Sequence, residues 1–245
     1  MAERRKKTPA SGGKRGRRGG TDPMADIIGA TMELAAERPW REITLTDIAE
    51  AAGMPLAELR GHVSCKGDVL RALADRADAA LLESLEEEPL DGEARDRLFE
   101  AIMRRLEFLA PWRAALRNIM NEPAAAACEC PPVLERYFIS QRWILAAAGL
   151  EAPGMEGAAR TFGLGMIYAR TLRTWVEDED PGLSRTMARL DRDLDRACRM
   201  ERRLAPAASA ARAACGLFRA VARAGRAALR PAAPAPEAPA EEGAS

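Results

Sequence analysis

The sequence is poor in the residues and runs that mark several classes of protein. Aromatic residues make up only 4% of the 245 residues, and there is a single histidine. No apolar run approaches the roughly 18 residues that a membrane-spanning helix needs. Neither a Gly-rich phosphate loop nor a nucleophile elbow is present. The five cysteines are scattered and odd in number, which suits neither a disulfide framework nor a zinc site. We therefore expect no enzymatic activity, no cofactor and no metal.

What is present favours helices. Apolar residues make up 47% of the chain, which is enough for a sizeable core. Ala, Leu, Arg and Glu are the dominant residues, and no stretch shows the alternating pattern of a strand. The N-terminus is charged and lacks the apolar segment of a signal peptide. We expect an all-α, soluble and cytoplasmic protein with reduced cysteines.

Charge is unevenly distributed although the formal net charge is zero. Residues 1–21 are Gly-rich and basic, without apolar periodicity, and are expected to form a disordered arm. Such an arm suits two uses, either tracking nucleic-acid phosphates and the minor groove or simply keeping the protein soluble.

The stretch from Thr44 to Leu70 has the pattern of two short helices, a tight turn between them and a third helix after them. Thr44 and Asp47 stand three residues apart, as in the capping box that starts a helix. Gly53 can adopt the positive φ that ends a helix, and Pro55 fits the first turn of the next one. These signals predict a helix-turn-helix, whose second helix can lie in the major groove of DNA.

The second helix of this motif is expected to pack by one face and to present the other. Leu56, Leu59 and Val63 recur at intervals of three and four residues, which marks the packing face. Lys66 begins the following helix, where a cation beside free backbone amides suits a DNA phosphate. His62 is expected to serve in DNA contact or packing. The predicted DNA-binding residues are Thr44, Thr46, Pro55, Leu56, Ala57, Glu58, Arg60, Gly61, His62 and Lys66.

Residues 86–92, EEEPLDG, form a polar break between an N-terminal domain over residues 22–85 and a larger helical domain over residues 92–204. Large side chains at helical spacing in the second domain suit either its core or a cavity for an apolar or amphipathic ligand. The candidates for such a pocket are Trp112, Met120, Tyr137, Phe138, Trp143, Phe162, Met166 and Tyr168. The last two long helices carry an apolar seam that fits a homodimer or an intramolecular hairpin. The candidates for a dimer interface are Phe162, Met166, Ala169, Leu183, Met187, Leu190 and Leu194.

Two stretches, IIGATMELAAERPWREITLTDIAEAAGM and SCKGDVLRAL, resemble the N-terminal domain of TetR-type (tetracycline-repressor family) transcriptional regulators. The resemblance implies a three-helix DNA-binding domain joined to a C-terminal helical bundle. It also implies a regulator, most often a repressor, that binds a palindromic operator in double-stranded DNA as a homodimer and is released by a small molecule. Arg60 stands where the family usually has a tyrosine, and a guanidinium there suits a stronger phosphate contact.

Residues 205–230 form a second distinctive stretch. Over residues 207–230, five arginines share one face of a predicted helix, with apolar residues opposite. Such a helix can lie reversibly on an anionic membrane, on DNA or on a partner, and residues 231–245 read as a disordered Pro/Ala tail. The preceding stretch, TWVEDEDPGLSRTMARLDRDLDRACRMERR, resembles TetR-fold accessory proteins of ubiquinone biosynthesis. The alternative that this implies is a non-enzymatic lipid-binding protein, associated with membranes through the basic helix.

Overall fold

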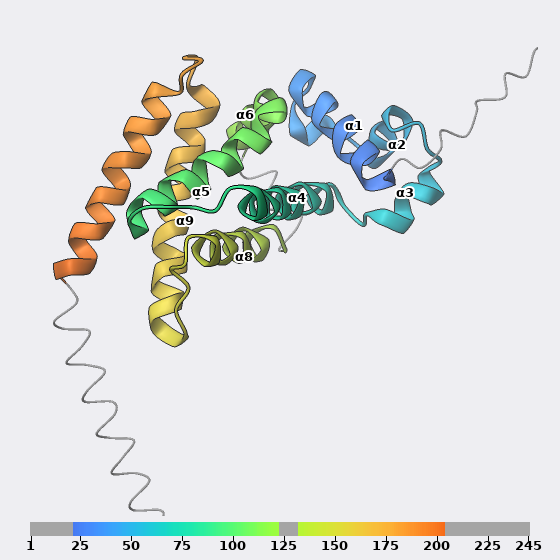
Figure 1. Cartoon of the computed structure of the whole chain (residues 1–245). Coiled ribbons are helices and arrows are strands. Elements are labelled where there is room, and N and C mark those ends of the chain that lie inside the picture. The colour runs from blue at the N-terminus through green and yellow to red at the C-terminus, as the bar shows by residue number, and fades with distance from the viewer. Residues whose placement is uncertain (1–21, 123–131, 204–245) are drawn as a thin grey trace, which may run out of the picture. The chain divides into compact units, whose positions relative to one another are not determined.

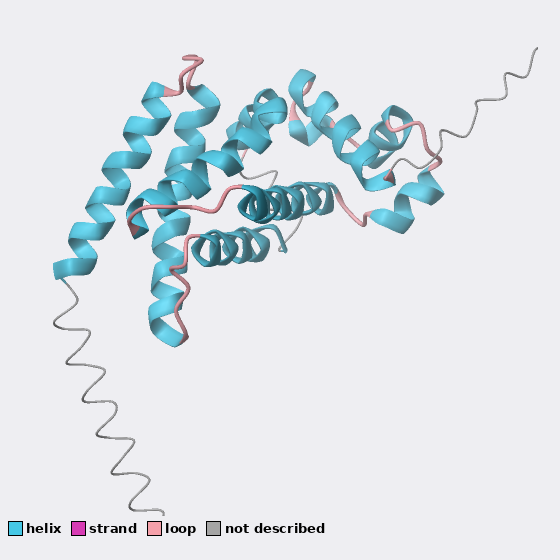
Figure 2. Cartoon of the chain, viewed as in Figure 1, coloured by secondary structure: helices cyan, strands magenta, loops and turns pink. Residues whose placement is uncertain are grey.

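The computed structural model describes residues 22–122 and 132–203 (Figure 1). Over these ranges every regular element is a helix (Figure 2), which confirms the all-α fold. Within the same ranges, none of the helices has the length and apolarity to cross a bilayer. Four parts of the chain lie outside the described residues: the predicted N-terminal arm, the segment with Cys128 and Cys130, the predicted basic helix over residues 205–230, and the predicted Pro/Ala tail.

The N-terminal elements follow the local signals of the sequence. They are α1 (Pro23–Glu37), the 3-10 helix η1 (Trp40–Glu42), α2 (Leu45–Ala51), α3 (Leu56–His62) and α4 (Lys66–Glu87). Asp22 caps α1 by accepting a 2.9 Å hydrogen bond from the Met24 amide, and Pro23 occupies the first position of the helix. Ile27 and Ile28 are buried beneath it. The helix therefore begins directly after its N-cap residue Asp22 and ends before its C-cap residue Arg38.

The remaining described elements form a second group of helices. They are α5 (Ala94–Leu109), η2 (Ala110–Trp112), α6 (Arg113–Asn121), α8 (Pro132–Ala147), α9 (Gly154–Glu177) and a helix over residues 184–203. The turn before the last helix depends on Asp178, which is fully buried. Its carboxylate accepts hydrogen bonds from the backbone amide and the hydroxyl of Thr186, at 2.8 and 2.7 Å.

Helix α4 is the element that the two groups share. It packs against α1, α5 and α8, while α1 also packs on α6, and α9 packs on α6 and α8. Asn118 of α6 donates to the carbonyls of Ala35 and Ala36, both at 3.0 Å, and so satisfies groups at the end of α1. The elements from α1 onwards form one compact unit that ends at Leu194. Residues 195–203 belong to a second unit and are also helical.

Candidate functional site

The start of α2 is held by the predicted capping box. The Asp47 amide donates to the Thr44 hydroxyl oxygen at 3.1 Å, and the Thr44 amide donates to the Asp47 carboxylate at 2.8 Å. Hydrogen bonds from the hydroxyl and amide of Thr44, with the nearby Arg38 guanidinium, lower the pKa of Asp47. The entry angle of α2 is thereby set by residues three positions apart in the sequence.

The turn between α2 and α3 uses Gly53 as expected. Its φ is 67°, a conformation that favours glycine, and its amide bonds to the Glu50 carbonyl at 3.1 Å. The Met54 amide bonds to the Ala49 carbonyl at 3.0 Å and closes the end of α2. Pro55 is the N-cap residue of α3, one position before the first turn in which it was predicted to lie.

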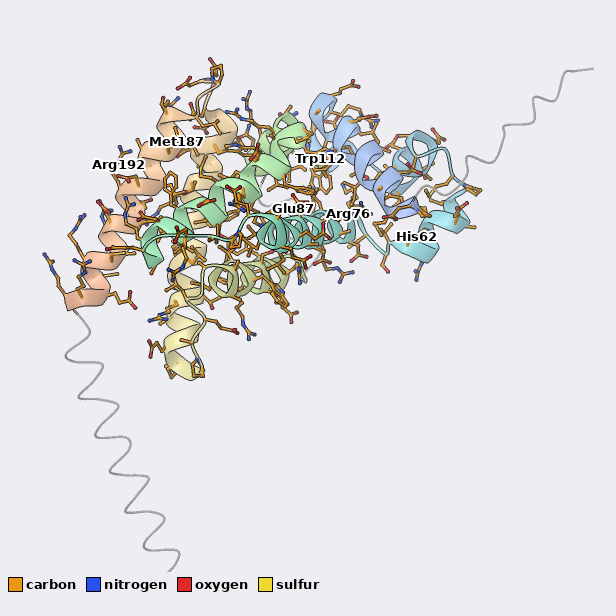
Figure 3. The ribbon with its side chains drawn as sticks, viewed as in Figure 1. His62, Arg76, Glu87, Trp112, Met187 and Arg192 are labelled. Atoms are coloured by element: carbon orange, nitrogen blue, oxygen red, sulfur yellow. The ribbon has the colours of Figure 1, made fainter. Side chains whose placement is uncertain are left out.

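Helix α3 is held by two side chains and presents the rest of its surface to solvent. Leu59 and Val63 are 1% and 3% exposed, whereas Leu56 is 51% exposed. The prediction that Leu56 packs inward with them is therefore wrong, because its side chain lies at the edge of the buried stripe. His62 is the last residue of α3 and is exposed (Figure 3). The predicted contact residues that are exposed are Thr44, Thr46, Pro55, Leu56, Ala57, Glu58, Arg60, Gly61 and His62.

Lys66 does not lie where the sequence suggested. It is 8% exposed, its Nζ donates to the Trp40 carbonyl at 2.8 Å and lies 5.0 Å from the Trp40 ring centroid. The Asp68 carboxylate accepts hydrogen bonds from the Ser64 and Cys65 amides at the start of α4. A phosphate contact by the Lys66 ammonium is therefore excluded in this conformation, because the cation joins η1 to α4 instead.

The other cations near α2 and α3 are largely matched by carboxylates. Arg38 contacts Asp47 at 3.4 Å, and Arg41 contacts Glu42 and Glu122, each at 3.5 Å. These arginines are drawn towards carboxylates of their own protein, which reduces the positive potential at this surface. Arg60 on α3 is exposed and becomes the main cation that this helix can offer.

A shallow groove of about 390 Å³ lies between α2 and α3. Its walls are mostly aliphatic and come from both helices of the motif. The lining residues are Leu45, Thr46, Leu56, Ala57, Leu59, Arg60 and Val63. The sequence did not predict this groove, since it depends on the crossing of the two helices.

The predicted ligand-pocket residues separate into groups. Tyr137 and Phe138 of α8 lie beside Tyr168 and Phe162 of α9, with ring centroids 6.2 Å apart in the pairs Tyr137–Tyr168 and Phe138–Phe162. Trp112 instead packs on Phe108, with ring centroids 5.6 Å apart. A groove of about 860 Å³ between α8 and α9 has only two of the predicted residues in its lining. That lining comprises Phe138, Arg142, Leu145, Glu151, Ala152, Pro153, Gly154, Gly157, Ala158, Thr161 and Phe162.

The predicted dimer-interface residues also divide. Phe162, Met166 and Met187 are 60%, 46% and 37% exposed, and Ala169 is exposed as well. Leu190 and Leu194 are only 0% and 2% exposed, because they pack within their own chain. These two leucines therefore support the intramolecular alternative, and assigning them to a dimer contact was wrong. Leu183 precedes the last helix, with a φ of 51°.

The cysteines depart from the reduced set that the sequence suggested. Among the described residues, Cys198 carries a free thiol, whereas Cys65, the residue before α4, is disulfide-bonded.

A buried polar network, not found from the sequence, joins the four helices α4, α5, α8 and α9. Asp78 accepts hydrogen bonds from Arg105 Nε at 2.9 Å, Arg136 Nη2 at 2.9 Å and Ser140 Oγ at 2.6 Å. Arg105 also donates to Ser140 Oγ at 3.3 Å and to the hydroxyl of Tyr168. Burial raises the pKa of Tyr168 above its ordinary value. Asp78 and Arg105 are 3% and 4% exposed, so α4 is tied to the second group of helices by paired charges.

Comparison with known proteins agrees with this architecture. No family model matches the chain. The chain is 27% identical over 194 residues to the HTH-type transcriptional regulator EthR of Mycolicibacterium smegmatis, a match that covers 69% of this chain and 84% of that protein. It is 28% identical to a TetR transcriptional regulator of known structure from Nitrosomonas europaea, with a TM-score of 0.58 over 73% of this chain and 99% of the other.

A TetR transcriptional regulator from Rhodococcus sp. RHA1 shares the fold at 15% identity, with a TM-score of 0.52 over 71% of this chain and 93% of the other. The likeness in sequence extends well beyond the helix-turn-helix, and the helical architecture is shared over nearly the whole length of the Nitrosomonas protein. The chain is therefore similar in sequence and in fold to TetR-type transcriptional regulators.

Proposed function

We propose that this protein is a TetR-type transcriptional regulator that binds a palindromic operator in double-stranded DNA as a homodimer, acts as a repressor, and is released by an apolar or amphipathic ligand. The observation that carries the proposal is the burial pattern of α3. The helix is fixed by Leu59 and Val63, which are buried, and its remaining side chains face solvent. A helix held in this way can enter a major groove about 12 Å wide without giving up its own packing.

Symmetry supports the homodimer. Two recognition helices that read a palindrome must be related by a two-fold axis. Exposed apolar side chains on α8 and α9 supply a surface for such a contact: Trp143 is 46% exposed, Phe162 60% and Met166 46%. Side chains of this size are enriched in interface cores. We place the dimer contact on this face, together with Ala169, rather than on Leu190 and Leu194.

Helix α4 supports coupling between a ligand and DNA binding. It begins at Lys66, four residues after the end of α3, and carries Asp78 into the buried network with α5, α8 and α9. A ligand that changes the packing of α8 or α9 would favour one position of α4 over another, and α3 follows α4 through the short connection. The α8–α9 groove and the aromatic group beside it are the proposed region for the ligand.

Fluorescence anisotropy of the full chain on duplexes from its own promoter region, over a range of salt concentrations, tests DNA binding. We expect saturable, sequence-selective binding, with a salt slope that falls by about 1 in Arg60→Ala if Arg60 contacts a phosphate. Arg192→Ala is the matched control, since Arg192 is an exposed arginine on the last helix (Figure 3). Light scattering should give twice the chain mass, and Phe162→Asp should give the monomer.

One alternative draws support from the matched charges around α2 and α3. A surface whose arginines already contact carboxylates is a poor duplex-binding face, which would suit the lipid-binding accessory protein. In that case no promoter duplex would bind selectively. Anionic liposomes would instead retain the full chain and release a chain lacking residues 205–230.

A further inference from the structure

The first turn of α3 presents an aliphatic side chain where a recognition helix meets base edges. Leu56 is the first residue of α3 and is 51% exposed, although it has the same side chain as the buried Leu59. In helix-turn-helix proteins the N-terminal residues of the second helix make the base contacts. The position of Leu56 therefore matters for sequence reading more than for packing.

The polar groups near Leu56 limit which bases this turn can read. The first three residues of α3 are Leu56, Ala57 and Glu58, and none of these side chains carries a hydrogen-bond donor when Glu58 is ionised. Guanine presents two acceptors in the major groove and requires a donor, whereas thymine presents a methyl group. The first turn thus offers no donor to guanine, whereas the aliphatic carbons of Leu56 and Ala57 match the thymine methyl and the Glu58 carboxylate can accept from the amine of a neighbouring cytosine or adenine.

The groove between α2 and α3 provides a surface that a thymine methyl group can contact. Leu56 and Ala57 form part of its wall with Leu45 of α2, while Arg60, one turn further along α3, lines the same groove. An occupant must place an apolar group against aliphatic carbons and carry negative charge close by. The edge of a thymine does so in duplex DNA, because its methyl projects into a major groove bordered by phosphates.

We propose that Leu56, with the aliphatic wall of the α2–α3 groove, reads the 5-methyl group of a thymine in each operator half-site, and that Arg60 anchors the adjacent DNA. This readout rests on the proposed function, since it requires α3 to enter the major groove. It makes Leu56 a specificity-determining residue and predicts thymine, or 5-methylcytosine, at one fixed position of each half-site.

Amplifying the same promoter fragment with dUTP in place of dTTP removes the methyl groups and leaves the base-pairing edges unchanged. Burial of one methyl corresponds to about a fourfold change in Kd, so two half-sites give a ratio of about 15 between thymine and uracil fragments. Leu56→Ala should bind the thymine fragment more weakly and reduce this ratio to near 1. Arg60→Ala should weaken binding to both fragments and keep the ratio.

The outcomes separate the readout from the proposed function. Leu56 is half exposed, so Leu56→Ala should keep the helical circular dichroism and the unfolding midpoint of the wild type. A Leu56→Ala protein that keeps the wild-type ratio overturns the readout while DNA binding stands. A wild-type protein that binds neither fragment overturns both. Leu56→Lys adds a further check, because a gained phosphate contact should restore affinity without restoring the ratio.

Discussion

Removal of the Asp78 carboxylate should be the most damaging single change in the buried network. Asp78→Ala takes away the acceptor of three hydrogen bonds, from Arg105, Arg136 and Ser140. Arg105 is 4% exposed, and its ion pair is with Asp78, so the substitution leaves a buried guanidinium without its counter-charge. Arg136 is less affected because it also contacts Asp75.

The size of the effect follows from this geometry. Leaving one partner of a buried ion pair uncompensated costs about 3–5 kcal/mol. For a chain of this size, that loss lowers the unfolding midpoint by roughly 6–20 °C. Arg105→Met should cost less than Asp78→Ala, since Asp78 would still accept from Arg136 and Ser140. The double variant Asp78→Leu with Arg105→Met should recover part of the loss, because apolar packing replaces the pair.

Urea unfolding of the full chain, followed by circular dichroism and tryptophan fluorescence, measures these free energies. Glu151→Ala is the control, because Glu151 and Arg142 are 3.9 Å apart with side chains 62% and 66% exposed. Such a surface pair contributes at most about 1 kcal/mol. If Asp78→Ala costs no more than Glu151→Ala, or less than Arg105→Met, the network does not join the helices as described.

Three further predictions concern the helix-turn-helix. Thr44→Ala should lower the unfolding free energy by about 1 kcal/mol. The pKa of Asp47 in the folded protein lies below its ordinary value of 3.8. The stabilisation that depends on the Asp47 carboxylate is therefore fully present above pH 3.8 and is lost as the pH falls through the folded pKa. A Thr44→Ala effect of the same size at about pH 2 would argue against a role for the carboxylate. Gly53→Ala should destabilise by about 1–2 kcal/mol because φ is 67°, whereas Gly61→Ala, with equally open space around the added carbon, should be neutral or stabilising by urea titration. Lys66→Met should weaken DNA binding less than Arg60→Ala in anisotropy, since its Nζ contacts Trp40 rather than solvent.

The helices of the N-terminal part could be predicted from the sequence because the signals that start and end them are local. Asp22 caps α1, Thr44 and Asp47 cap α2, and Gly53 ends it. Each of these effects operates between residues at most five positions apart, so the local sequence is enough to reveal it. The helical spacing of Leu59 and Val63 likewise identified the packed face of α3, although the predicted stripe wrongly included Leu56.

Three features depend on contacts between residues that are distant in the sequence. They are the direction of the Lys66 side chain, the burial of Leu190 and Leu194, and the network around Asp78. Asp78 and Arg105 are 27 positions apart, and Arg105 and Tyr168 are 63 apart. A lysine at a helix start, or an apolar seam at helical spacing, fits either an internal or an external partner equally well from spacing alone. The sequence by itself determined the helices and the helix-turn-helix, whereas only tertiary packing decided which charges pair and which apolar faces stay open. The physical reason is that partner choice depends on desolvation and on distances that no periodic pattern encodes.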